Sequence, residues 1–117
     1  MHGGEDIPLL PEAANMTEVI LAMTGKRFGC VGLVDASGVL TGIITDGDLR
    51  RHWAERMQEK KPAEIMTRSP RTAPLGALAS AALETMNRMK ITVLFIVAGG
   101  KPVGILHIHD LLKAGVA

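Results

Sequence analysis

The sequence predicts an α+β (α/β-like) protein made of two tandem copies of one β-α-β-β-α unit. The first observation is an internal repeat: the run GIITDGDLRR, which begins at Gly42, returns sixty-two residues later as GILHIHDLLK, which begins at Gly104. The second is that apolar residues recur at helical spacing ahead of each β-rich run. The third is the length of 117 residues, because neither half buries much surface alone. We therefore expect the two units to pack as one pseudo-twofold domain.

The first repeat predicts five elements in order. A short extended segment lies near Pro8, and an amphipathic helix follows, because Met16, Val19 and Met23 recur at helical spacing. The run ASG supplies a turn between two β-rich strands, and a closing helix begins near Asp48. The strands are expected at residues 7–10, 30–35 and 40–45.

The second repeat predicts the same order. Its first helix presents Ala82, Met86 and Met89 on one face, the run AGG supplies the turn, and a closing helix begins near Asp110. The strands are expected at residues 69–73, 92–98 and 102–108. The methionines of both amphipathic helices are predicted to belong to the core.

The repeat also predicts the boundaries of the units. We place the first unit at residues 1–58, a linker at 59–65 and the second unit at 66–117. The linker is charged and contains Pro62, which stops or restarts a helix. Because the chain starts close to the start of a repeat, we expect it to be part of a longer protein.

Composition argues against several classes of partner. The formal net charge is +1, which predicts no bulk attraction to nucleic acid or to a membrane surface, and 3% aromatic residues leave little to stack on bases. The longest apolar run, residues 91–98, is too short to span a bilayer. Cys30 is the single cysteine, so no intrachain disulfide can form, and we expect a buried, unreactive thiol in the cytoplasm.

The repeated motif G-I-I-T-x-x-D-L resembles that of tandem cystathionine-β-synthase (CBS) domains, over essentially the whole chain. The runs GIITDGDLRR and GILHIHDLLKAGV are similar to those of the C-terminal CBS pair of bacterial arabinose-5-phosphate isomerases. This resemblance implies a regulatory region that is attached to an N-terminal sugar-isomerase domain. Nothing in the chain resembles that catalytic domain, so we expect no catalytic residues, no cofactor and no enzyme activity here.

The resemblance also implies a nucleotide site in the cleft between paired CBS units. It assigns ribose hydroxyls to Thr45 and Asp48 in the first unit and to Asp110 in the second, and phosphate to Lys90. His107 departs from the pattern, because it stands in place of the motif threonine. The two units are therefore unequal, and we expect one good nucleotide site rather than two.

A structural interpretation of Thr45 and Asp48 stays open beside the ligand interpretation. Thr45 at the N-cap and Asp48 three residues on form a variant of the capping box. A carboxylate at that junction can also accept both hydroxyls of a vicinal diol. His107 is expected to be a poor cap although Asp110 is still present, which favours a ligand role for these carboxylates.

His107 and His109 are expected on one side of a strand, because they are two residues apart. Three interpretations are open: a metal site, a histidine bonded to backbone at the strand end, or a contact with an oxyanion of a ligand. No third metal ligand follows at a convincing spacing, so we expect no metal. Arg50 and Arg51 are expected on a solvated helix face.

Three functions compete. The first is a ligand-sensing module, the second is a dimerisation or assembly module with empty clefts, and the third, an independent enzyme, lacks a catalytic constellation. A homodimer is expected from apolar positions on the closing helices, namely Leu49, Trp53, Leu111 and Leu112. Because the resemblance places the parent enzyme in the pathway to the acidic sugar Kdo, CMP-Kdo is our hypothesis for the ligand. AMP or ATP is the alternative.

Overall fold

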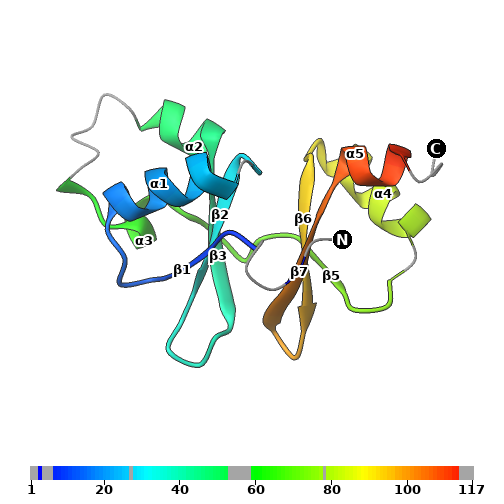
Figure 1. The fold of residues 1–117 in the computed structure, drawn as a ribbon, viewed down its shortest axis with the longest axis horizontal. Coiled ribbons are helices and arrows are strands. Elements are labelled where there is room, and N and C mark those ends of the chain that lie inside the picture. Colours follow the sequence, from blue (N-terminus) through cyan, green and yellow to red (C-terminus); the bar gives the residue numbers. More distant parts are fainter. Residues whose placement is uncertain (1–2, 4–6, 27, 53–58, 78, 114–117) are drawn as a thin grey trace. The chain divides into compact units, whose positions relative to one another are not determined.

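The computed structural model describes residues 3, 7–26, 28–52, 59–77 and 79–113 (Figure 1). They form a mixed α+β structure with two separate sheets. Two compact units result: one is Pro8–Pro70, and the other is Arg71–Ala117 together with Met1–Ile7. The predicted α+β class and the tandem repeat are confirmed. Among the described helices, none combines the length and the apolar character that crossing a membrane requires.

The unit Pro8–Pro70 contains a four-stranded sheet in the order β1-β2-β3-β4. β1 is parallel to β2, whereas β2 and β3, and β3 and β4, are antiparallel. The elements are β1 (Leu9–Pro11), α1 (Met16–Lys26), β2 (Cys30–Val34), β3 (Leu40–Thr45), α2 (Asp46–Arg51), α3 (Pro62–Ile65) and β4 (Thr67–Arg68).

The unit that contains Arg71–Ala117 repeats this order in a three-stranded sheet, β5-β6-β7. β5 is parallel to β6, and β6 is antiparallel to β7. The elements are β5 (Thr72–Pro74), α4 (Ala79–Met89), β6 (Val93–Ala98), β7 (Lys101–His107) and α5 (Ile108–Lys113). Each predicted strand and helix is therefore present within a few residues of its expected place.

Both predicted turns join antiparallel strands. Between β2 and β3, the Asp35 carboxylate accepts the backbone N–H groups of Ser37 and Val39 at 2.8 and 3.1 Å. Between β6 and β7, Gly99 and Gly100 have φ values of 60° and 80°. Two consecutive positive φ angles are what a two-residue hairpin needs to match the twist of its strands, and glycine adopts them without steric cost.

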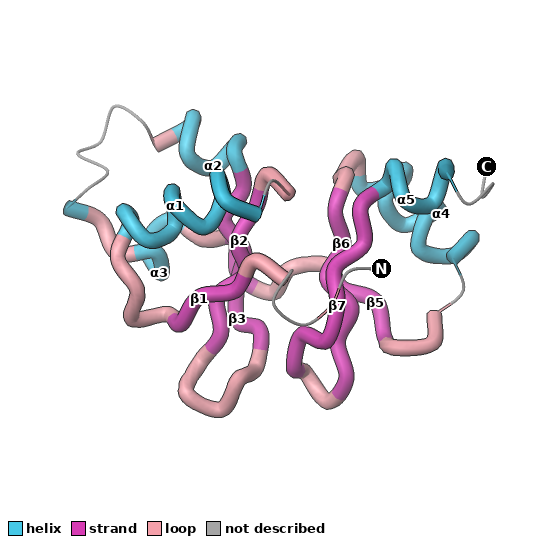
Figure 2. Tube along the Cα trace, viewed as in Figure 1, coloured by secondary structure: helices cyan, strands magenta, loops and turns pink. Residues whose placement is uncertain are grey.

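Each unit has its own apolar core between its sheet and the helices on one side of that sheet (Figure 2). Met16, Met23 and Met86 are buried, as predicted. Met89 is 37% exposed, so its assignment to the core is wrong. It is the last residue of α4, and the chain turns away directly after it, because Lys90 has a φ of 56°.

The linker region contributes structure to the first unit. Pro62 opens α3, and β4 follows it and pairs with β3, with Arg68 opposite Gly42 and Thr67 opposite Ile43. The first compact unit therefore includes the linker region and ends at Pro70. The boundaries at residues 58 and 65 refer to the repeat in the sequence and stay a prediction, as does the packing of the two units about a pseudo-twofold axis.

Candidate functional site

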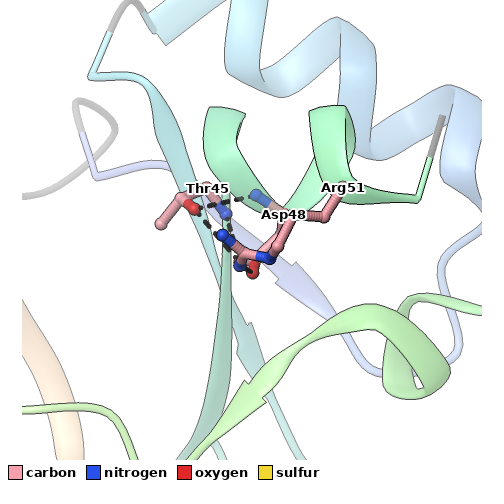
Figure 3. A network of polar contacts seen from close by, with 3 residues as sticks. All are labelled: Thr45, Asp48 and Arg51. Atoms are coloured by element: carbon pink, nitrogen blue, oxygen red, sulfur yellow. Dashed lines mark hydrogen bonds and ion pairs between the residues drawn. The ribbon is translucent and has the colours of Figure 1, made fainter.

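The start of α2 carries a complete capping box (Figure 3). Thr45 is the N-cap, and its Oγ1 accepts the backbone N–H of Asp48 at 3.2 Å. In return, Oδ2 of Asp48 accepts the Thr45 N–H at 2.9 Å and the Thr45 hydroxyl at 3.1 Å. The structural interpretation of this pair is confirmed, because the two residues satisfy backbone donors that the helix itself leaves without partners.

Arg51 completes the polar network at Asp48. Its Nη2 donates to Oδ1 of Asp48. The Asp48 residue is only 3% exposed, whereas the Arg51 side chain is 65% exposed. The aspartate is thus a buried carboxylate whose two oxygens both accept from the protein, and one of its partners reaches in from the surface.

Gly47 makes room for this arginine. A Cβ atom added to Gly47 would lie 3.3 Å from Nη1 of Arg51 and 4.0 Å from Nη2 of Arg50. Both arginines are exposed, as expected, but Arg51 folds back over the start of its own helix. The solvated helix face expected for Arg51 does not include this contact, although the spacing of Asp and Arg three residues apart is one that brings side chains together on a helix.

The start of α5 is capped by a similar pair of hydrogen bonds to different side chains, with the N-cap accepting the N–H two residues on instead of three. Nδ1 of His107 accepts the backbone N–H of His109 at 3.1 Å, and Oδ2 of Asp110 accepts the backbone N–H of His107 at 3.2 Å. The expectation that His107 is a poor cap is wrong, because an unprotonated ring nitrogen accepts a hydrogen bond much as a hydroxyl oxygen does. The presence of Asp110 is therefore explained by capping and no longer favours a ligand role by itself.

His109 lies on the helix and not on the strand, since β7 ends at His107. The expectation that both rings share one side of a strand is wrong for this reason. The rings nevertheless meet: their centroids are 4.7 Å apart with an angle of 16° between the planes, and His109 is exposed. Within the described residues, no three His, Cys, Asp or Glu side chains are grouped so that they could hold a metal ion.

Lys90 is an exposed residue directly after α4 with a φ of 56°. Its N–H donates to the Asn87 carbonyl at 3.3 Å, and the N–H of Ile91 donates to the Met86 carbonyl at 2.9 Å. This pair of bonds is the Schellman termination of a helix, in which the left-handed position is usually glycine. Lys90 thus has a structural place at the end of α4, and its predicted contact with phosphate stays a prediction.

Cys30 is buried at the start of β2, where it pairs with Thr45 of β3. Burial and, to a smaller extent, the neighbouring Asp46 carboxylate raise the pKa of the Cys30 thiol to about 12. Both effects disfavour the thiolate, which is the reactive form of cysteine. Cys30 is therefore an inert, apolar residue, as predicted from the sequence.

The family model of the CBS domain matches this chain twice, at residues 4–55 and 63–117. The chain belongs to the CBS domain family. The two matched segments correspond to the two repeats, so the chain is a CBS pair, with the Thr45–Asp48 and His107–Asp110 boxes at equivalent places in its two units.

The CBS pair is similar to part of longer curated proteins. It is 42% identical over 117 residues to an uncharacterized protein of Rickettsia prowazekii, and 37% identical over 118 residues to the arabinose 5-phosphate isomerase KdsD of Yersinia pestis. These matches cover 100% and 99% of this chain. The chain spans little more than a third of those relatives, 37% and 36% of their lengths, and corresponds to the C-terminal part of the isomerase.

The fold is also similar to that of a solved CBS pair. A CBS-domain protein of Pyrobaculum aerophilum, solved in complex with AMP, matches with a TM-score of 0.81 and 26% identity. The match covers 95% of this chain and 92% of that one.

Proposed function

We propose that this CBS pair is a ligand-sensing module that binds a nucleotide or a nucleotide sugar and regulates an attached sugar-phosphate isomerase domain. The observation that carries the proposal is the similarity to the Pyrobaculum aerophilum protein, which was solved with AMP and matches almost the full length of both chains. A ligand regulates such an assembly when its affinity differs between two states of the catalytic domain.

The identity of the parent enzyme is part of the proposal. The chain is 37% identical to the corresponding part of the Yersinia pestis arabinose 5-phosphate isomerase, which supports a cytoplasmic isomerase of the Kdo and lipopolysaccharide pathway. CMP-Kdo, the activated product of that pathway, is then the ligand we propose for feedback control. AMP or ATP is the alternative, and the AMP complex of the solved relative favours it.

The residues proposed for the ligand are those that the sequence predicts. Thr45, Asp48 and Asp110 are proposed for ribose hydroxyls and Lys90 for phosphate. His107 and His109 are proposed for further oxyanions. Since Nδ1 of His107 accepts a backbone hydrogen bond and His109 is exposed, His109 is the better placed of the two.

Calorimetric titration of the chain with AMP, ATP, CMP and CMP-Kdo tests the proposal. We expect binding of at least one of the four, and tighter binding of CMP-Kdo than of CMP if the sugar acid is recognised. Lys90→Ala should weaken binding of the ligand. Lys101→Ala is the matched control, because it removes another exposed lysine from the same unit. If none of the four binds, the sensing function is wrong.

A homodimer is the second part of the proposal, and the structure narrows the residues that support it. Leu111 is buried in the core of its own unit, so it is not available to a partner, and Leu49 is already partly buried against the other core. Trp53 lies outside the described residues. Leu112 is 51% exposed on α5, which favours a contact there. Light scattering at high micromolar concentration should give twice the monomer mass, and Leu112→Asp should lower it; a monomer mass for the unaltered chain would contradict the dimer.

A further inference from the structure

Both oxygens of the Asp48 carboxylate already accept hydrogen bonds from donors of the protein itself. Oδ2 accepts both the N–H and the hydroxyl of Thr45, and Oδ1 accepts from the guanidinium of Arg51. A ribose diol donates two hydroxyl hydrogen bonds to such a carboxylate, which has about four acceptor sites in all. The diol therefore needs at least one of the present donors to leave.

Arg51 is the donor that no capping bond holds in place. The Thr45 N–H belongs to the capping box of α2, and the Thr45 hydroxyl oxygen, which donates to Oδ2, is held in the same box by the Asp48 N–H. The Arg51 side chain is 65% exposed, and its guanidinium lies against Asp48 (Figure 3). Gly47 leaves space beside that guanidinium. Its departure breaks a charge-assisted bond, however, so a ligand has to replace what the guanidinium loses.

We infer that Arg51 determines the specificity of the proposed nucleotide site at Asp48 by selecting ligands that carry both a ribose diol and a phosphate. This inference rests on the proposed function. The diol takes the place of the guanidinium at Oδ1, and the released Arg51 pairs with the phosphate, to which a guanidinium can donate two parallel hydrogen bonds. The charge-assisted bond is exchanged and not lost. A nucleoside offers Arg51 no anion, so Arg51 competes with it for Asp48.

The same exchange is not expected at the second unit. Lys113 stands at the position of Arg51 in the repeat, and His109 stands at the position of Gly47. A lysine lacks the planar fork of arginine. The glycine that leaves room for the guanidinium is also replaced there by a residue whose ring stacks on His107. Selection by this route is thus a property of the unit Pro8–Pro70.

Binding of two matched pairs of probes tests the inference: AMP with adenosine, and CMP with cytidine. Calorimetry on the full chain should show that each nucleotide binds more tightly than its nucleoside. In Arg51→Ala, we expect the ratio of the two affinities to fall by about tenfold, because nucleosides gain access to Asp48 and nucleotides lose a charged partner. Arg50→Ala removes an equal charge from the neighbouring residue and should change the ratio by no more than about twofold.

Two results overturn the inference while the proposed function stands. One is an unchanged ratio in Arg51→Ala although the probes still bind, and the other is an equal fall in Arg50→Ala, which would indicate a general effect of charge. If no probe binds the unaltered chain, the proposed function fails and the inference fails with it. Circular dichroism checks the fold of each variant. Arg51→Gln, which keeps most of the side-chain length without the charge, should give the same fall in ratio if Arg51→Ala does not fold.

Discussion

The starts of α2 and α5 are each capped by two hydrogen bonds to backbone N–H groups, but the side chains differ, and the N-cap accepts the N–H three residues on in α2 and two residues on in α5. In both, the N-cap side chain accepts a backbone N–H of the first turn, and an aspartate at the third position accepts the N–H of the N-cap residue. At α2 the cap is the hydroxyl of Thr45, and Arg51 covers the carboxylate. At α5 the cap is the imidazole of His107, and a second imidazole stacks on it.

This difference shows what the repeat preserves. The repeat keeps the hydrogen bonds that a helix start needs, and threonine and histidine are two ways of making them. The exchange of Thr45 for His107 therefore needs no ligand to explain it. The two sites differ chemically in the side chains around the cap. At α2 a buried carboxylate is paired with an arginine, and at α5 two histidines stack on each other.

The largest expected effect is on the free energy of unfolding, and it should distinguish the buried Asp48 from the half-buried Asp110. Asp48→Ala should lower the free energy of unfolding by about 3 kcal/mol, because a buried box loses its acceptor and a charge-assisted bond is lost. Asp110→Ala should cost about 1 kcal/mol, since Asp110 is half-buried and its box resembles an ordinary exposed cap. Urea denaturation followed by circular dichroism measures both, and equal losses would show that burial does not distinguish the two sites.

Alkaline pH should affect the unit Pro8–Pro70 through Cys30, whose counterpart in the repeat is the exposed Thr92. The thiol pKa is raised from 9.0 to about 12, so the native state keeps its proton where the unfolded chain loses it. The contribution of the protonated Cys30 thiol to stability is therefore complete below pH 9 and is lost as the pH rises toward 12. Between pH 9 and about pH 10.5 the unaltered chain should lose about 2 kcal/mol more than Cys30→Ala. Parallel pH profiles for the two proteins would contradict the assignment.

How far the sequence predicts the fold and the site depends on whether the features are local. The strands, turns and helices follow from periodicity and from a repeat of fixed length, and the Thr45–Asp48 box follows from its spacing. The cap by His107 was missed because histidine is not among the usual capping residues, and its role depends on which ring nitrogen faces the helix. The contact of Arg51 with Asp48 was missed because it depends on a side-chain conformation over Gly47.

A cap swap should sharpen the comparison with a smaller effect. His107→Thr puts the side chain of the first repeat at the second helix start, so we expect the free energy of unfolding to stay within about 0.5 kcal/mol of the original value. His107→Ala removes the acceptor and should cost about 1 kcal/mol. Thermal denaturation of both variants at pH 7 separates them. If threonine proves as destabilising as alanine, the ring of His107 contributes by its stacking on His109 and not by capping.

The smallest expected effect concerns the end of α4 and distinguishes a structural from a ligand role for Lys90. A residue other than glycine at a φ of 56° is strained by about 1–2 kcal/mol, of which about 0.5–1 kcal/mol is offset by the greater flexibility of glycine in the unfolded chain. Lys90→Gly should therefore stabilise the protein by about 0.5–1 kcal/mol, whereas Lys90→Ala, which keeps a Cβ atom, should not. Both substitutions remove the same charge, so both should weaken nucleotide binding equally if Lys90 contacts phosphate. Chemical denaturation and calorimetry on the same two variants then separate strain from charge. A gain in stability with unchanged affinity would leave Lys90 as a helix-terminating residue alone and would remove it from the proposed site.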